Sequence, residues 1–283
     1  LSYKNINTAP IFNNTSETIP VLAVLHSTHV KNIDMVYESV IKNTYKHIFN
    51  NLNRYSGIIV STKQQQLDIS ARINNEIPVH TIPVGYIDEH STNLKRNNYS
   101  INNNKIISVA RYSPEKQLNH QIELVSKLIK EFPNIKLHLY GFGKEEEKYK
   151  QLITEYNLEN NVFLRGFKRN LSAEIQDAYM SLITSNMEGF NLGLLETIAE
   201  GIPPVGYNSK YGPSELILNN ENGYLINKND KDELYNRVRN LLLDKTLRDT
   251  FSQECINHSK YFSSKIVMKL WEDRFSTINP SYE

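Results

Sequence analysis

The chain has 283 residues, a net charge of +1 and 22% charged residues, so no strong field directs it to nucleic acid or an acidic membrane surface. Its single cysteine, Cys255, excludes an internal disulfide, and no spacing of Cys and His indicates a zinc site. No apolar run approaches the roughly 18 residues of a membrane span, and Leu1–Pro20 is too polar for a signal peptide. We therefore expect a globular cytoplasmic chain of one large or two ordinary domains. Because it begins with Leu, we expect a piece of a longer or processed protein.

Short apolar runs alternate with segments of helical spacing along the chain. The first part holds expected strands at Val21–Leu25, Gly57–Val60 and Val79–Pro83 and expected helices at Met35–Leu52 and Thr62–Ile73, with Thr62 as N-cap. The polar segment Asn93–Asn104 is typical of a linker. The expected strands after it are Ile106–Ala110, Lys136–Tyr140, Asn161–Leu164, Met180–Thr184, Pro204–Tyr207 and Tyr224–Ile226. The expected helices after it are Leu118–Phe132, Lys144–Tyr156, Leu171–Tyr179, Leu192–Glu200, Lys231–Leu243, Thr246–Tyr261 and Ile266–Phe275. This alternation predicts an α/β fold with parallel sheets, helices on both faces and a ligand site beyond the carboxyl ends of the strands.

The most informative segment runs from Glu188 to Glu196 and holds two carboxylates eight residues apart. Gly189 and Gly193 mark a turn from a strand to a helix. Such a turn leaves backbone N–H groups unpaired at the helix start, which favours an anion there. One carboxylate before the turn and another one turn into the helix can both face a ligand bound at that point.

Two cations follow the first strand of the second part. Arg111 and Lys116 lie where this strand gives way to a helix, and an Arg fork with a Lys point charge suits a diphosphate. Alone, the pair is more typical of a solvated turn, but together with the two carboxylates it favours a phosphate site. Gly141 and Gly143 follow another strand and allow either close ligand approach or a tight turn with positive φ.

Three further loops follow strands. An aromatic ring with adjacent cations, within Arg165–Asn170, fits either a nucleobase site or an ordinary surface loop. The segment Lys210–Glu215 fits either a helix entry with Pro213 or the lining of the same site. His26 and His29 end the first strand of the chain, where a structural role is the default and contact with a sugar is the alternative.

Taken in order, these segments resemble the retaining glycosyltransferases of family 4, which have the GT-B fold of two Rossmann-like domains. The matching residues are Arg111 with Lys116, Gly141 to Gly143, Val162 to Gly166, Glu188 to Glu196 (the EX7E motif) and Asn222 to Leu225. Within that family, Leu25–His29 and Lys210–Ser214 are similar to the wall teichoic acid α-glycosyltransferases of Gram-positive bacteria and the related enzymes that modify serine-rich adhesins. The resemblance covers the chain from about residue 20 to its end.

The resemblance implies catalytic roles. Arg111 and Lys116 would bind the donor diphosphate, and Glu188 would contact the donor sugar. One of His26 and His29 would lie by the reactive carbon of the sugar, with His29 ranked slightly ahead. The remaining donor-binding residues implied by the family are Glu196 at the ribose, the amides of Asn191, Leu192 and Gly193 at the phosphate, Gly141 close to the donor, and Phe167, Lys168 and Asn170 at the uracil.

The resemblance also implies a reaction and its partners. The sugar of UDP-glucose or UDP-N-acetylglucosamine would pass to a polymer or protein acceptor by front-face displacement with retention. No cofactor or metal would be needed, because the cations take the place of a metal, and nucleic acid would not be a partner. Peripheral association with the inner face of the plasma membrane, through the missing part of the protein, and a homo-oligomer are left open.

The same resemblance implies a domain plan and leaves alternatives. Residues 1–95 would be the C-terminal half of an acceptor-side domain, residues 96–262 the donor-binding domain, and residues 263–283 a helix that crosses back to the first domain. Only three strands precede Asn93, so the first domain is expected to be incomplete. The alternatives are a glycosyltransferase for serine-rich surface protein or capsule, and a non-catalytic GT-B-like partner subunit. A dehydrogenase is excluded because no GxGxxG opens a βαβ unit.

Overall fold

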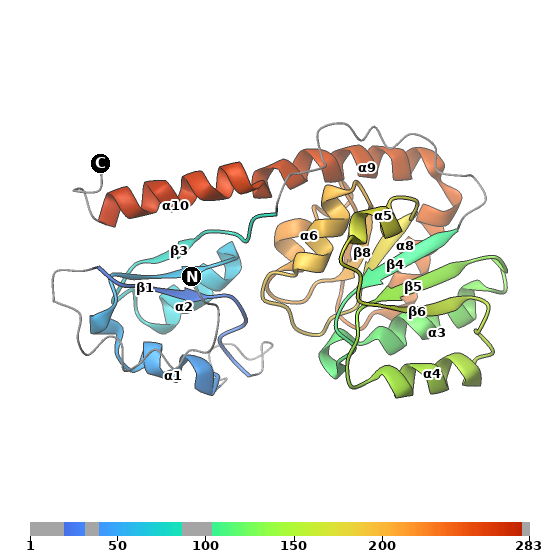
Figure 1. Ribbon diagram of the computed structural model, residues 1–283, viewed down its shortest axis with the longest axis horizontal. Coiled ribbons are helices and arrows are strands. Elements are labelled where there is room, and N and C mark those ends of the chain that lie inside the picture. Colours follow the sequence, from blue (N-terminus) through green and yellow to red (C-terminus); the bar gives the residue numbers. More distant parts are fainter. Residues whose placement is uncertain (1–19, 32–39, 87–103, 279–283) are drawn as a thin grey trace. The chain divides into compact units, whose positions relative to one another are not determined.

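The computed structural model describes residues 20–31, 40–86 and 104–278, and the chain divides into two compact units (Figure 1). Unit 1 comprises Leu1–Val84 together with Val267–Glu283, and unit 2 comprises Gly85–Ile266. The predicted domain boundary between residues 95 and 96 and nearly all of the predicted linker lie outside the described residues. Among the residues described, no helix is both long and apolar enough to cross a membrane.

Unit 1 contains a three-stranded parallel sheet in the order β1 (Leu22–Leu25), β2 (Gly57–Val60) and β3 (Val79–Thr81). Helices α1 (Asn43–Phe49) and α2 (Lys63–Arg72) bury apolar side chains on one face of it. Because side chains alternate along a strand, Ile59 of β2 lies on the opposite face, where it packs with Val267 and Trp271 of α10 (Ser264–Ile278). The first and last segments of unit 1 therefore share one core.

The predicted helix Met35–Leu52 is wrong in its central part. Val30 and Ile41 form an antiparallel bridge, in which the Lys31 N–H bonds the Val40 carbonyl at 3.0 Å. The helix begins only at Asn43, and residues 35–39 lie outside the described residues. Apolar spacing in this segment fits a helix, but pairing with the residues after β1 holds Val40 and Ile41 extended.

The predicted N-cap at Thr62 is confirmed. Its hydroxyl accepts a hydrogen bond from the Gln65 backbone N–H at 3.2 Å, which satisfies one of the open amides at the start of α2. The turn from β2 to α2 is therefore fixed by local chemistry.

Unit 2 is built on a six-stranded sheet in which all neighbours are parallel, as predicted. In spatial order its strands are β6 (Val162–Gly166), β5 (Lys136–Tyr140), β4 (Lys105–Val109), β7 (Met180–Ile183), β8 (Pro204–Tyr207) and β9 (Tyr224–Ile226). The chain runs outward from β4 in one direction and then from β7 in the other, so the order reverses between β4 and β7. Ligands of open α/β sheets bind at such a reversal, outside the carboxyl ends of the strands.

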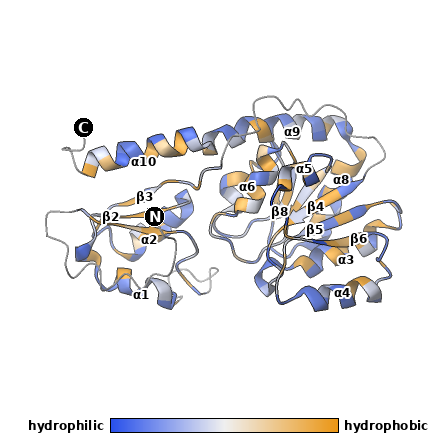
Figure 2. Cartoon of the chain, viewed as in Figure 1, coloured by the Kyte–Doolittle hydropathy of each residue, from blue (hydrophilic) through white to orange (hydrophobic). Residues whose placement is uncertain are grey.

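Helices cover both faces of this sheet (Figure 1). Apolar side chains of α3 (Leu118–Leu128), α4 (Glu146–Glu155) and α8 (Lys231–Leu243) join the main core on one face. On the other face, Ile175 of α5 (Leu171–Ile175) packs against Ile107 and Tyr140, and α6 (Leu192–Ala199) contacts β7, β8 and α9 (Lys245–Ser259). Figure 2 shows the apolar residues along the strands and the mixed faces of the helices around them. The shorter helices are η3 (Leu52–Arg54), η4 (Pro114–Lys116), α7 (Pro213–Leu216) and η5 (Lys260–Phe262).

The start and end of unit 2 lie side by side. Tyr86 forms a parallel bridge with Ser263, its N–H bonds the Phe262 carbonyl at 3.1 Å, and the Ser264 N–H bonds the Tyr86 carbonyl at 3.0 Å. The two points at which the chain passes from one unit to the other are thus joined within unit 2.

Candidate functional site

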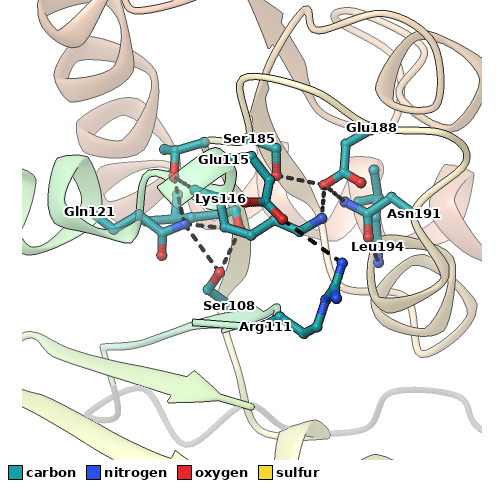
Figure 3. A network of polar contacts seen from close by, with 11 residues as sticks. Ser108, Arg111, Glu115, Lys116, Gln121, Ser185, Glu188, Asn191 and Leu194 are labelled. Atoms are coloured by element: carbon teal, nitrogen blue, oxygen red, sulfur yellow. Dashed lines mark hydrogen bonds and ion pairs between the residues drawn. The ribbon is translucent and has the colours of Figure 1, made fainter. Parts of the chain in front are cut away.

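The candidate site lies where the strand order of unit 2 reverses. Arg111 and Lys116 follow β4, Glu188 follows β7, and α6 begins at Leu192 (Figure 3). Parallel strands end at one edge of the sheet, so residues far apart in sequence meet here. The structure therefore brings together the four charged groups expected from the sequence on the loops and the helix at this edge.

Glu188 and Lys116 form a buried ion pair. Lys116 Nζ lies 2.6 Å from Glu188 Oε1, and the side chains are 14% and 6% exposed (Figure 3). Two other donors reach the same oxygen: the Ser185 hydroxyl at 2.5 Å and the Asn191 side-chain amide at 2.9 Å. The Glu188 side chain is thus held by one cation and two neutral donors.

The loop that carries Lys116 is fixed to β7 through buried polar groups. Thr184 directs its hydroxyl at the carbonyls of Lys116 and Gln117, both at 3.0 Å. Gln121 of α3 donates to the Thr184 hydroxyl at 2.9 Å and to the Ser108 hydroxyl at 3.1 Å. These bonds set the backbone from which the Lys116 side chain reaches Glu188.

The start of α6 offers open backbone N–H groups. Asn191 caps the helix: its side-chain oxygen accepts from the Leu194 N–H at 3.0 Å, and its carbonyl accepts from the Leu195 N–H at 3.2 Å. No acceptor among the described residues binds the N–H groups of Asn191, Leu192 or Gly193. Unpaired amides at the positive end of a helix favour a bound anion, as the sequence predicts.

Arg111 differs from Lys116 in its surroundings. Its side chain is 77% exposed, and its nearest carboxylate, Glu115, is 3.8 Å away. Such a loose surface pair contributes little to stability. The guanidinium is therefore available to a ligand with little loss to the free protein.

The glycines of the site serve packing. A Cβ on Gly193 would lie 2.7 Å from the Val109 carbonyl oxygen, so this glycine lets α6 start directly against the end of β4. Gly141 has φ +138°, and its Cβ would lie 1.9 Å from the Ala110 carbonyl oxygen. For Gly141 and Gly143 the tight-turn explanation has direct support, because a side chain at either would clash with the loop after β4.

Glu196 lies one turn into α6 on an exposed position. Desolvation by the protein around the carboxyl group nevertheless raises the pKa of Glu196 above its ordinary value. The Glu196 side chain is thus exposed to solvent on one side, while the protein shields its carboxyl group on the other. A hydrogen-bond donor such as a hydroxyl, bound here, would favour the ionised form.

The aromatic part of the site contains a residue that the sequence analysis did not single out. Phe167 and Phe142 are 69% and 61% exposed, and their rings meet edge to face with centroids 6.5 Å apart. They follow β6 and β5, two neighbouring strands. Phe142 lies between Gly141 and Gly143, and in this motif only the glycines were predicted to belong to the site. Two exposed rings together form a surface on which a planar base can stack.

The other two residues of the predicted uracil site have partners within the protein. Lys168 forms an ion pair with Glu174 at 3.2 Å. Asn170 caps α5 through a bond from the Ala173 N–H at 3.3 Å. Their polar groups thus already contribute to local structure.

The two histidines lie in unit 1 and differ in exposure. His29 is 0% exposed and stacks on Phe49 with ring centroids 6.0 Å apart. Burial, with the nearby charges of Arg72 and Lys42, lowers the pKa of His29 to about 3. His26 is exposed, and partial burial of its ring lowers its pKa. His29 therefore has the features of a neutral histidine of the core, although the sequence ranked it slightly ahead of His26 as the residue beside the sugar. Of the two, His26 is the accessible histidine.

The loop Lys210–Gly212 lies along the loop that carries Glu188. The Glu188 N–H bonds the Lys210 carbonyl at 3.2 Å, and the Tyr211 N–H bonds the Glu188 carbonyl at 2.9 Å. A Cβ on Gly212 would lie 2.0 Å from the Phe190 carbonyl oxygen. The loop therefore supports the backbone of Glu188, and its glycine permits the close contact.

Among the described residues, no group of three or more His, Cys, Asp or Glu side chains could hold a metal ion. Among the described residues, the charged side chains at the site include Arg111, Lys116, Glu188 and Glu196, with Glu115 beside Arg111.

Known proteins are similar to this chain in sequence and in structure. The poly(ribitol-phosphate) alpha-N-acetylglucosaminyltransferase of Staphylococcus aureus strain COL is 27% identical over 277 residues, which cover 94% of this chain and 53% of that protein. The poly(glycerol-phosphate) alpha-glucosyltransferase of Bacillus subtilis strain 168 is 28% identical over 253 residues, which cover 88% of this chain and 36% of that protein. The chain thus spans about half, or less, of the length of these curated relatives.

A solved structure extends the comparison to three dimensions. A mutant of S. aureus TarM, crystallised with fondaparinux, alpha-GlcNAc-glycerol and UDP, matches with a TM-score of 0.80 and 26% identity over 95% of this chain and 53% of that chain. The fold is accordingly of the GT-B type. The family model described as glycosyl transferases group 1 matches residues 91–258. The chain belongs to the group 1 glycosyltransferases.

Proposed function

We propose that the protein is a UDP-sugar-dependent retaining hexosyltransferase that moves glucose or N-acetylglucosamine to a cell-wall polymer such as teichoic acid. The observation that carries the proposal is the Lys116–Glu188 ion pair beside the open amides of α6, in a chain of the group 1 glycosyltransferases. A cation and backbone N–H groups at one point suit a diphosphate, and a fixed carboxylate suits sugar hydroxyls.

The donor would extend along the carboxyl edge of the unit 2 sheet. Lys116, Arg111 and the amides of α6 would hold the diphosphate, and Glu196 would accept hydrogen bonds from the ribose hydroxyls. The base would stack on Phe142 and Phe167. This assignment follows the order of the strands, since β6 and β5 carry the rings and β4 and β7 carry the charges.

Both donor sugars and several acceptors remain candidates. Of the two relatives described above, one transfers N-acetylglucosamine and the other glucose, and both act on polyol phosphate polymers. The similarity to both is nearly equal, so it supports the polymer class and leaves the sugar to experiment. A protein acceptor is the competing possibility.

In the proposed reaction, the bond from the anomeric carbon to the diphosphate oxygen breaks, and a bond from that carbon to the acceptor oxygen forms on the same face. The acceptor proton passes to the leaving diphosphate. Lys116, Arg111 and the α6 amides stabilise the negative charge that develops on the leaving group. No metal takes part in this scheme, because the two cations neutralise the diphosphate.

The test is a transfer assay with the full-length protein of which this chain is part. UDP-glucose and UDP-N-acetylglucosamine are offered with poly(ribitol phosphate), poly(glycerol phosphate) or a serine-rich peptide, with and without EDTA. We expect transfer of one sugar to a polyol phosphate, an α-linkage by NMR, and no effect of EDTA. Transfer to the peptide alone would make the acceptor a protein. An absence of UDP binding in calorimetry would refute the proposal as a whole.

A further inference from the structure

We infer that Ser185 and Asn191 are positioning residues that commit one oxygen of Glu188, Oε1, to the protein, so that Oε2 is the oxygen presented to the donor sugar. This inference rests on the proposed function and deepens it. The protein uses the two oxygens of the Glu188 carboxylate unequally (Figure 3).

All the donors that reach the Glu188 carboxylate from the described residues reach Oε1. They are Lys116 Nζ at 2.6 Å, Ser185 Oγ at 2.5 Å and Asn191 Nδ2 at 2.9 Å. Within the same part of the chain no donor contacts Oε2, which still reaches solvent although the residue is only 6% exposed. A carboxylate held through one oxygen by three donors cannot rotate without losing them. The other oxygen of Glu188, Oε2, is therefore held in one fixed orientation.

Asn191 couples this carboxylate to the helix start. Its side-chain oxygen caps α6 at the Leu194 N–H, while its side-chain nitrogen donates to Glu188. A side-chain amide supplies an acceptor and a donor on two separate atoms of one short side chain. Asn also tolerates the left-handed backbone at this position, where φ is +80°. The open amides of α6 and the free oxygen of Glu188 are thereby set in one rigid arrangement.

Ser185 and Asn191 matter most once the donor is bound. An ammonium has three N–H groups, and Lys116 gives one to Glu188, so the others can turn to the diphosphate. A diphosphate that draws Lys116 toward itself weakens the hold of Lys116 on Oε1. Ser185 and Asn191, which are neutral, keep their bonds to Oε1 and hold the carboxylate in place.

Two substitutions of Asn191 separate positioning from capping. Asn191→Asp keeps the capping oxygen and tolerates positive φ, but it replaces the donor with a second carboxylate. In Asn191→Gly, the glycine adopts the positive φ readily and replaces the N-cap with little loss of helix stability. The change removes the donor to Glu188 without adding a charge. Ser185→Ala removes the second neutral donor. As a matched control, Asp244→Ala removes the cap of α9, where Asp244 accepts from the Leu247 N–H at 2.9 Å.

The experiment measures kcat and KM for the UDP-sugar, UDP affinity by calorimetry, and thermal unfolding, all with the full-length protein. For Asn191→Gly and Ser185→Ala we expect kcat to fall by about 10- to 100-fold, because a small misplacement of a group that acts on the substrate costs that much. The affinity of these variants for UDP, which lacks the sugar, should stay within about twofold of the wild-type value, because the contacts that bind the nucleotide are unchanged. Asn191→Asp should lose more kcat, because it replaces a donor to Glu188 with a second carboxylate that repels it.

The outcomes that overturn the inference differ from those that overturn the proposed function. A wild-type kcat in Asn191→Gly and Asn191→Asp would leave Asn191 a helix cap and refute positioning, whether or not the unfolding temperature falls as it does in Asp244→Ala. Equal losses of UDP affinity and kcat in these variants would show that they disturb the phosphate site instead. A wild-type protein that neither binds UDP nor transfers sugar would refute the proposed function itself.

Discussion

The Lys116 ammonium and the Glu188 carboxylate lie 2.6 Å apart although 72 residues separate them in the chain. The contact exists because β4 and β7, which precede them, are neighbours in the parallel sheet. Each charge is desolvated and depends on the other, since removing one partner of a buried pair leaves an uncompensated charge. Substitutions on the two sides of the pair should therefore have opposite effects on diphosphate binding.

Glu188→Gln should abolish sugar transfer and leave UDP affinity equal to or tighter than that of the wild type. The amide keeps the shape of the side chain but not its charge, so the whole charge of Lys116 becomes available to the diphosphate. Calorimetric titration with UDP and a single-turnover transfer assay measure the two effects separately. Strong residual turnover would exclude Glu188 as the sugar-binding carboxylate.

Arg111→Ala and Lys116→Met should both weaken UDP binding but differ in stability. Charge-assisted hydrogen bonds contribute about 1.5–3 kcal/mol each, so either change should cost roughly tenfold or more in affinity. Arg111 is 77% exposed, and its removal should leave thermal unfolding unchanged. Lys116→Met strands the buried Glu188 carboxylate and should destabilise unit 2 by up to about 3–5 kcal/mol.

For these two variants the measurements are UDP calorimetry and urea unfolding. An unchanged UDP affinity in both would contradict the diphosphate site. Equal destabilisation by both would contradict the difference in burial.

UDP-sugar binding should weaken as the pH falls, and Glu196 should be the cause. Desolvation raises the pKa of Glu196, so its ionised, hydrogen-bond-accepting form is present above that raised value and is lost as the pH falls through it. The loss should begin at a higher pH than for a freely exposed glutamate, whose pKa is about 4.3. Titration of a UDP-sugar between about pH 4.5 and 7 measures this. A Glu196→Gln variant should bind more weakly and lose that part of the pH dependence; if its profile matches the wild type, another group is responsible.

Phe142→Ala and Phe167→Ala should each weaken UDP binding by about 1–3 kcal/mol, the usual contribution of base–aromatic stacking. The matched control is Tyr261→Ala, since Tyr261 is 67% exposed and lies outside the site. Affinity for pyrophosphate should not change in either phenylalanine variant. If the control loses as much UDP affinity as the two variants, the rings do not carry the base.

Sequence patterns were sufficient for the sheet of unit 2 and for the charged groups at its edge. Parallel strands buried on both faces appear as short apolar runs, and loops after such strands meet at one edge whatever the details of packing. Arg111, Lys116 and Glu188 could therefore be grouped without coordinates. Local chemistry also sufficed at Thr62, where the N-cap depends on a neighbour three residues away.

Features that depend on tertiary contacts or on an unusual backbone conformation could not be predicted from the sequence. The extended backbone at Ile41 follows from its pairing with Val30, and the burial of His29 from its stacking on Phe49. For Asn191 only the backbone amide was predicted to belong to the site. Its side chain bonds Glu188 three residues away, a local contact, but one that depends on the positive φ of Asn191. Gly141 was ambiguous until the carbonyl of Ala110 was known to lie against it.

The shared core of the first and last segments of unit 1 has a consequence for synthesis on the ribosome. Val267 and Trp271 pack on the face of β2 that carries Ile59. All of Gly85–Ile266 is translated after β2 and before these two residues. Unit 2 has its own core and adjacent ends, so it can fold as soon as it has emerged. The strands of unit 1, by contrast, leave the ribosome without this cover and keep an apolar face open until α10 has been translated. A truncation just before Val267 should accordingly yield a nascent chain with a folded unit 2 and an aggregation-prone unit 1.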